Sequence, residues 1–219
     1  MNDTAALNLA AMLCSRLCHD LLSPIGAMSN GLELLAEERD PAMRERCIEL
    51  LEQSARTSAD KLKFFRLAFG AAGGFDEAVP VEEPQALISA LAANNSRIQL
   101  NWALADPTMP KSSVKVLLNL AQIAIEALVR GGTLDIGAET RGAHNEIVVR
   151  AAGERVVFDD TIGQTLEGRL PADQLSSRTA AAHMVALLAE TQGGQLQYHA
   201  DRNTLVLGAV MPAGEGLIG

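Results

Sequence analysis

The start of the chain carries apolar residues at helical spacing in two long segments. From Thr4 to about Glu38 an apolar residue recurs in alternating steps of four and three, the spacing of a heptad seam. This first seam consists of Leu7, Ala11, Cys14, Cys18, Leu21, Ile25, Met28, Leu32 and Leu35. The pair Asp40-Pro41 is typical of a helix cap with proline at the first helical position. The second seam follows it and consists of Ile48, Leu51, Ala55, Ser58, Leu62, Phe65 and Phe69. The pattern predicts two long helices joined by a tight turn as an antiparallel hairpin.

A lone hairpin of this kind cannot cover its own apolar seams. Two hairpins from two chains would cover them by forming a four-helix bundle, so we expect a homodimer. The alternative is that the following domain covers the seams within one chain.

After Gly70, Gly73 and Gly74 the spacing of apolar residues changes and predicts shorter elements. We expect helices at 84–94, 112–130 and 179–191, and strands at 96–102, 133–139, 146–151, 195–199 and 204–211. This pattern predicts an α+β layer with its helices on one face of the sheet. The predicted domains are a helical hairpin at 1–72 and an α+β domain at 76–219.

Composition and charge then narrow the class of protein. The 219 residues are 48% hydrophobic, enough for a core, and 18 Lys+Arg against 27 Asp+Glu leave a net charge of −9. Such a chain has no basic field to bind nucleic acid or an anionic membrane surface. Three cysteines and no basic flank before the first apolar stretch argue against a secreted disulfide protein. We therefore expect a cytoplasmic protein with no transmembrane segment.

His19 is the residue to which the pattern assigns chemistry, because it falls one position past the seam on the outer flank of the first helix. Its helical neighbours are Ser15, Arg16, Leu22 and Ser23, with Gly26 two turns away. A neutral imidazole exposed on a rigid helix has a nitrogen free to attack phosphorus, and small neighbours leave room for another protein. A metal site with Cys14 and Cys18 is not expected, because both cysteines lie in the seam, where small apolar residues belong.

Two further residues set this histidine apart from an ordinary surface histidine. Asp20 can orient the imidazole or accept its proton. Pro24 has no N–H, so it frees the carbonyl of Asp20 and bends the helix. Proline inside a helix costs about 3 kcal/mol and therefore needs a reason, although its combination with an exposed histidine is not specific to one function. With the turn near residue 39, the opposite helix places Arg56, Lys61 or Lys63 close to the histidine, or leaves them as ordinary solvated charges.

One segment resembles the H-box of histidine kinases, in which a phosphoacceptor histidine is followed by an acidic residue, Leu, a variable pair and Pro: Cys18-His19-Asp20-Leu21-Leu22-Ser23-Pro24-Ile25. The segment 117–124 resembles the kinase N-box. The resemblance implies a dimerisation and phosphotransfer hairpin followed by a domain of the histidine-kinase/HSP90-type ATPase (Bergerat) fold.

The departures from the kinase pattern all fall on the nucleotide site. Ile123 stands where the N-box places its magnesium-ligating Asn, and an apolar side chain cannot bind a hard cation. The segment 151–155 lacks the adenine-binding Asp of the first glycine box, and 176–179 replaces the glycines of the second with larger residues. The nucleotide lid is reduced to 159–177. We therefore expect no ATP and no metal bound to this chain.

A kinase-like fold that keeps its histidine and loses its ATP site resembles the ChpT-type histidine phosphotransferases. The resemblance implies transfer of phosphoryl from the receiver aspartate of a CckA-like hybrid histidine kinase, through a phosphohistidine, to the receiver domains of CtrA-like and CpdR-like response regulators. The receivers bring their own Mg²⁺. The implied catalytic residues are His19 as phosphoacceptor and Asp20 as proton partner or orienter, and the implied partner-binding residues are Arg16, Leu22, Ser23 and Gly26.

Two other functions stay open on the sequence. One is an ATP-dependent sensor histidine kinase, and the other is a non-catalytic dimeric adaptor that binds receiver domains. Leu22 stands where many kinases carry Arg, Lys or Asn, and its apolar area would suit a docking receiver helix.

Overall fold

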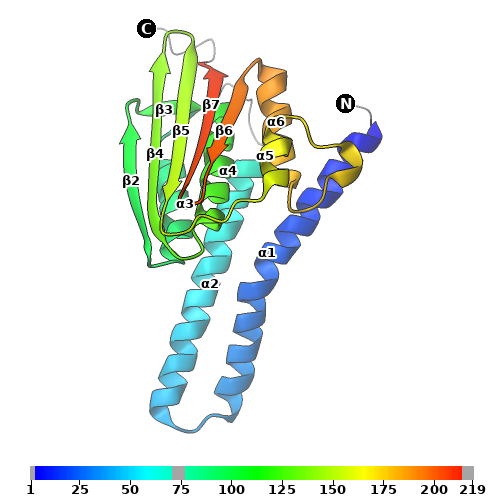
Figure 1. The fold of residues 1–219 in the computed structure, drawn as a ribbon. Helices are drawn as coiled ribbons and strands as arrows, with labels where there is room; N and C mark the ends of the chain where they lie inside the picture. The colour runs from blue at the N-terminus through cyan, green and yellow to red at the C-terminus, as the bar shows by residue number, and fades with distance from the viewer. Residues whose placement is uncertain (1–2, 71–76, 214–219) are drawn as a thin grey trace.

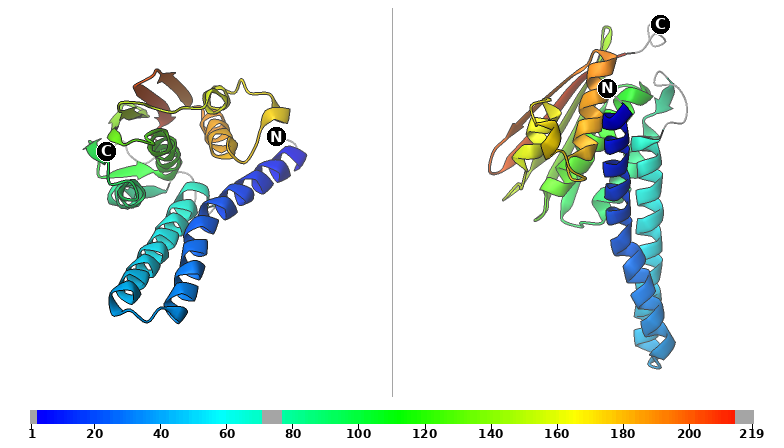
Figure 2. Two further views of the ribbon diagram at one scale, coloured as in Figure 1. Left: turned by 60° about the horizontal axis from the view of Figure 1, so that its bottom comes forward. Right: turned by 90° about the vertical axis from the view of Figure 1, so that its right-hand side faces the viewer.

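The computed structural model describes residues 3–70 and 77–213. Helix α1 (Asp3–Glu37) and helix α2 (Pro41–Phe69) form the predicted antiparallel hairpin, drawn in blue and cyan in Figure 1. The Asp40 side chain caps α2 by accepting a hydrogen bond from the Met43 amide at 3.2 Å. Helix α1 continues through Pro24 and changes direction along its length (Figure 2). The predicted domain ends at 72 and 76, with Gly73 and Gly74, lie outside the described residues.

Each predicted seam of the hairpin divides into a packed half and an exposed half. The packed half includes Leu21 and Met28 of α1 and Leu51, Ser58 and Phe65 of α2, all partly or fully buried. Leu21 and Phe65 pack with the core of the α+β layer. The exposed half consists of Leu7, Ala11, Cys14, Cys18, Ile25 and Leu32 of α1 and Ile48, Ala55 and Leu62 of α2. The expectation that the following domain covers the seam within one chain is therefore wrong for these positions. We call this exposed half the open seam.

The rest of the described chain forms an α+β layer, as predicted. In chain order its elements are β1 (Ala78–Pro80), α3 (Glu82–Ala93), β2 (Ile98–Leu104), β3 (Thr108–Pro110), α4 (Lys111–Ala127), β4 (Gly132–Arg141), β5 (His144–Ala152), α5 (Asp160–Leu166), a 3₁₀ turn (Ala172–Gln174), α6 (Ala180–Gln192), β6 (Gln195–Ala200) and β7 (Thr204–Pro212). The five-stranded sheet has the order β2-β4-β5-β7-β6, in which only the β2–β4 pair is parallel. The helices cover one face of this sheet (Figures 1 and 2).

The sequence pattern did not predict β1, β3 and α5. The strands β1 and β3 pair only with each other, and each is too short to show an alternation. Helix α5 lies in the segment expected to be a trimmed lid. Its Ile162 and Leu166 are buried in the core, and the Asp159 side chain caps it by accepting from the Thr161 amide at 2.9 Å. This segment therefore packs as part of the domain.

The hydrophobic core extends from the α+β layer into the end of the hairpin. Phe64 and Phe65 of α2 belong to the same core as Leu117 and Leu118 of α4. The Lys115 ammonium of α4 donates to the carbonyl of Gly70 at 2.5 Å. Helix α1 in turn lies against α6 (Figure 2). The hairpin and the sheet are thus held in one arrangement by packing. Among the residues described, no helix combines the length and the apolarity needed to cross a membrane.

Candidate functional site

His19 lies on α1 where that helix passes the α+β layer, and its side chain is 85% exposed, as the seam predicted. The imidazole Nδ1 is 3.2 Å from Asp20 Oδ1. Asp20 as a carboxylate can only accept, so this hydrogen bond assigns the proton to Nδ1. The other ring nitrogen, Nε2, then carries the free lone pair. The geometry therefore favours the Nδ1–H tautomer and presents Nε2 to solvent as the nucleophilic nitrogen.

Asp20 is held on two sides by groups of the hairpin. Its second carboxylate oxygen, Oδ2, accepts from Arg16 Nε at 2.9 Å. Its backbone carbonyl, the one freed by Pro24, accepts from the Lys61 ammonium of α2 at 2.7 Å. Of the three basic residues expected near the histidine, Lys61 therefore contacts Asp20, the residue that follows the histidine in the chain.

The other two basic residues of α2 make contacts along their own helix. Arg56 pairs with Glu52 and Lys63 pairs with Asp60. Arg56 and Lys63 are therefore ordinary solvated charges, which was the alternative expectation.

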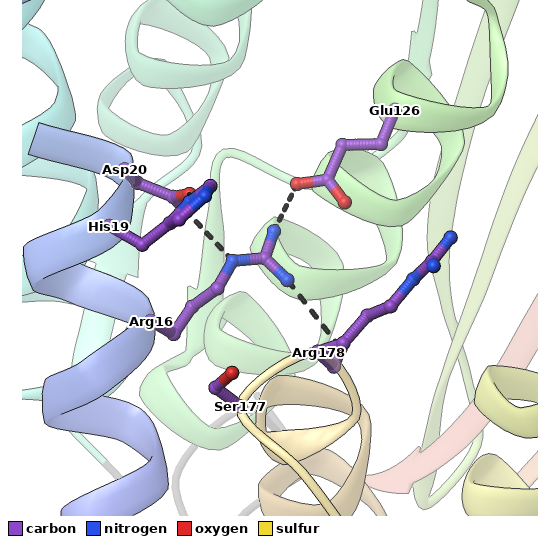
Figure 3. A pocket seen from close by; sticks show the side chains of 6 residues that line it. All are labelled: Arg16, His19, Asp20, Glu126, Ser177 and Arg178. Carbon is purple, nitrogen blue, oxygen red and sulfur yellow. Dashed lines mark hydrogen bonds and ion pairs between the residues drawn. The ribbon is translucent and has the colours of Figure 1, made fainter. Parts of the chain in front are cut away.

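Arg16 joins the hairpin to the α+β layer (Figure 3). Besides Asp20, its guanidinium binds the carboxylate of Glu126 at the end of α4, and it donates to the carbonyl of Arg178 ahead of α6 at 3.5 Å. Burial opposes the charge of Arg16, but Glu126 and Asp20 outweigh it and raise the pKa of the guanidinium. Only 13% of the side chain is exposed, so Arg16 offers little surface to the partner it was expected to contact.

These groups line a cavity of about 380 Å³ between α1, the end of α4 and the start of α6. Its lining consists of Arg16, His19, Asp20, Glu126, Ser177 and Arg178. The Arg178 side chain also pairs with Asp159 at 3.1 Å. Sequence reasoning missed Glu126, because no local pattern links the end of α4 to α1. It treated Ser177 and Arg178 only as replacements for glycine.

Three other predicted site residues border His19 on its open side. Leu22 is 67% exposed and Ser23 is exposed. A Cβ added at Gly26 would meet nothing within 4 Å. Small or apolar groups thus flank the histidine, and nothing within the described chain blocks it there.

The residues at the expected nucleotide site do not fit a nucleotide with magnesium. Ile123 is a buried apolar side chain on α4 and offers no ligand to a hard cation. Asn119, one turn earlier, is buried: its amide nitrogen donates to the carbonyl of Lys115 at 2.8 Å, while its Oδ1 has no hydrogen-bond partner among the described residues. Ahead of α6 the Ser176 amide donates to the Thr179 hydroxyl at 3.0 Å, so it is not free for a phosphate. Among the residues that the structure describes, no three His, Cys, Asp or Glu side chains gather as a metal site.

A histidine-bearing hairpin in front of an α+β layer of this topology defines the class of histidine-kinase-like cores. The histidine kinase domain of the EL346 blue-light activated histidine kinase from Erythrobacter litoralis has this fold, with a TM-score of 0.50 at 11% identity over 86% of this chain and 96% of that chain. A solved bacterial phosphotransferase is much more similar, with a TM-score of 0.81 at 34% identity over 93% of this chain and 96% of that chain.

Sequence comparison identifies the family within that class. Residues 81–204 match the family model of the histidine phosphotransferase C-terminal domain. The protein phosphotransferase ChpT of Brucella abortus is 33% identical over 94% of this chain and 96% of its own. The chain therefore belongs to the histidine phosphotransferase family, as the H-box and the altered nucleotide site predicted.

Proposed function

We propose that this protein is the histidine phosphotransferase of a bacterial multistep phosphorelay and works without ATP. It takes phosphoryl from the receiver aspartate of a CckA-like hybrid histidine kinase and passes it through a phosphohistidine to CtrA-like and CpdR-like response regulators. The observation that carries the proposal is the exposed imidazole of His19, whose Nδ1 is held by Asp20. The named partners are part of this proposal, and the similarity to the protein phosphotransferase ChpT supports it.

The chemistry consists of two in-line transfers. In the first, His19 Nε2 attacks the phosphorus of the receiver's aspartyl phosphate, so that the N–P bond forms, the P–O bond breaks and the receiver carboxylate leaves. The imidazole ring gains positive charge while its Nδ1–H points at Asp20, whose carboxylate stabilises that charge. In the second, the aspartate of the next receiver attacks the same phosphorus, and the bonding electrons return to Nε2.

A receiver domain would supply what this chain lacks for that reaction. Mg²⁺ bound to the receiver neutralises the phosphoryl charge, so no cofactor is required here. We infer that the receiver approaches over Leu22, Ser23 and Gly26, the open side of the histidine. The reaction takes place in the cytoplasm, where such receivers meet it.

The open seam supports a homodimer. Its exposed apolar side chains run along both helices at heptad positions, and a second hairpin would cover them as a four-helix bundle. The dimer leaves His19 accessible, because the histidine lies beside the seam and not in it.

Incubation with a receiver carrying ³²P-labelled aspartyl phosphate tests the function. Wild-type protein should gain acid-labile label and pass it to a second receiver. His19→Ala should gain none, whereas His144→Ala, which removes an exposed histidine on β5, should transfer as wild type does. Absence of label on the wild type would favour the adaptor function. Label from ATP without a donor receiver would favour the sensor kinase.

A further inference from the structure

Glu126 occupies an electrostatically unfavourable position that the transfer reaction does not explain. It lies in the last turn of α4, where the negative end of the helix dipole opposes a carboxylate. Partial burial raises the pKa of Glu126, against the effect of Arg16. The Gln122 amide one turn earlier also donates to it, at 3.1 Å. The side chain is 45% exposed, and its charged partner is Arg16 of the hairpin.

The partner of Glu126 is the same guanidinium that holds Asp20. Arg16 is bound in three directions by three parts of the chain: Nε by Asp20 on its own helix, one terminal nitrogen by Glu126 on α4, and the other by the carbonyl of Arg178 ahead of α6. A planar guanidinium group bound in this way cannot rotate without losing at least one hydrogen-bond partner. Its orientation, and with it the position of Asp20 Oδ2, is therefore fixed from outside the hairpin.

We propose that Glu126 is a positioning residue for phosphotransfer at His19, acting through Arg16 and Asp20. This inference rests on the proposed function. The four residues form a continuous chain of contacts, Glu126–Arg16–Asp20–His19, whose last contact is the 3.2 Å approach of Asp20 Oδ1 to Nδ1 (Figure 3). Glu126 never touches the reacting atoms.

The physical effect is a division of one positive charge between two carboxylates. With Glu126 in place, Arg16 is drawn toward α4 and binds Asp20 through Nε alone, so Oδ1 stays available to the imidazole. Without the negative charge on α4, the guanidinium is free to bind both oxygens of Asp20, since bidentate pairing is the stronger arrangement. The imidazole would then share Oδ1 with the guanidinium, which weakens the hold on Nδ1–H. The imidazole would populate both tautomers, and the tautomer protonated at Nε2 has no lone pair there to attack phosphorus.

The first test measures the tautomer directly. In wild-type protein labelled with ¹⁵N-histidine at pH 8, the two ring nitrogens of His19 should give the shifts of an Nδ1–H tautomer. Glu126→Gln keeps the shape of the side chain and removes its charge, and it should move both shifts toward the values of a mixed population. Arg16→Lys, which keeps the charge but loses the planar guanidinium group, should do the same and serves as the second variant. Glu190→Gln, an exposed carboxylate of α6, is the control and should leave the His19 shifts unchanged.

The second test measures transfer from the labelled receiver. Glu126→Gln should slow acceptance of phosphoryl about tenfold, while Glu190→Gln transfers as wild type does. In an Asp20→Asn background the same Glu126→Gln change should slow transfer less than twofold, because the residue it acts through is already lost. Equal slowing in both backgrounds would show an effect independent of Asp20 and would overturn the inference.

The failures of the two proposals can be told apart. If wild-type protein accepts label but Glu126→Gln and Arg16→Lys keep the wild-type rate and the wild-type ¹⁵N shifts, the positioning role is wrong and the phosphotransferase function stands. If wild-type protein accepts no label, the function is wrong, whereas the ¹⁵N shifts of the unphosphorylated protein still decide whether Glu126 sets the tautomer.

Discussion

The α+β domain and the hairpin place their apolar residues in opposite ways. In α4, Leu118 is 0% exposed and lies in a core built from the same chain. In the hairpin, Leu32 is 59% exposed although it occupies a heptad position as regular as any in the sequence. The α+β domain is therefore complete within one chain, whereas half of the hairpin seam has no partner in it. The same periodicity predicts a core in both places, but only in the first is that core intramolecular.

We expect the largest effect, on the free energy of unfolding, from a substitution in the α+β domain, whose core is complete within one chain. Leu118→Ala removes a fully buried side chain from the centre of α4 and should lower the free energy of unfolding by about 2–5 kcal/mol. Urea denaturation followed by circular dichroism measures this change. The loss should be the same at every protein concentration, and a loss that grows on dilution would contradict the assignment of this core to a single chain.

A substitution in the open seam should instead weaken the association of two chains. Leu32→Glu places a charge where we propose that a second hairpin packs, and burial of one leucine contributes about 1.5–3 kcal/mol. Because the dimer carries the substitution in both chains, we expect its dissociation constant to rise roughly 100-fold or more, measured by sedimentation equilibrium. Leu34→Glu is the matched control, because Leu34 is also 59% exposed but lies outside the seam. Equal dissociation constants for the two variants would remove the seam as the dimer interface.

We expect the smallest effect, on the rate of transfer, from a substitution at Leu22, which lies between the open seam and the histidine. Leu22→Glu should slow transfer from a receiver about tenfold, because the receiver would lose apolar area at its docking surface, while the unfolding midpoint stays unchanged. The transfer assay and a thermal melt check both parts. Leu22 is four residues from Cys18 and three from Ile25, so it also adjoins the open seam. A variant that dissociates the dimer but transfers at the wild-type rate would assign Leu22 to the seam instead.

The fold could be predicted from the sequence wherever its signal is periodic over many residues. The two heptad seams predicted the hairpin, and alternation with turn residues predicted the five strands of the main sheet within a few residues. The short strands β1 and β3 offered no period. The division of each seam into two halves could not be predicted, because a heptad records that a position is apolar and not which chain covers it.

In the candidate site too, contacts between residues close in sequence could be predicted, whereas contacts between distant residues could not. Arg16 and Asp20 are four residues apart on one helix, and their contact follows from helical spacing. Glu126 lies 110 residues from Arg16, and Arg178 lies 162 residues from it. Their approach depends on how α1 packs against α4 and α6, which no local pattern encodes. The sequence therefore predicted His19, Asp20 and the neighbouring Arg16 and Lys61, but not Glu126 and Arg178, which hold Arg16 from the α+β layer.

The contact between Lys61 and the carbonyl of Asp20 has a mechanical consequence for the hairpin. A proline in α1 leaves that carbonyl without its helical donor, and the ammonium of the opposite helix takes the vacant place at 2.7 Å. Sliding α1 along α2 by a single turn, about 5.4 Å, would break this bond and leave the carbonyl unpaired. The two helices are thus pinned in register one residue from the histidine. Every receiver would therefore meet the imidazole at the same height on the hairpin.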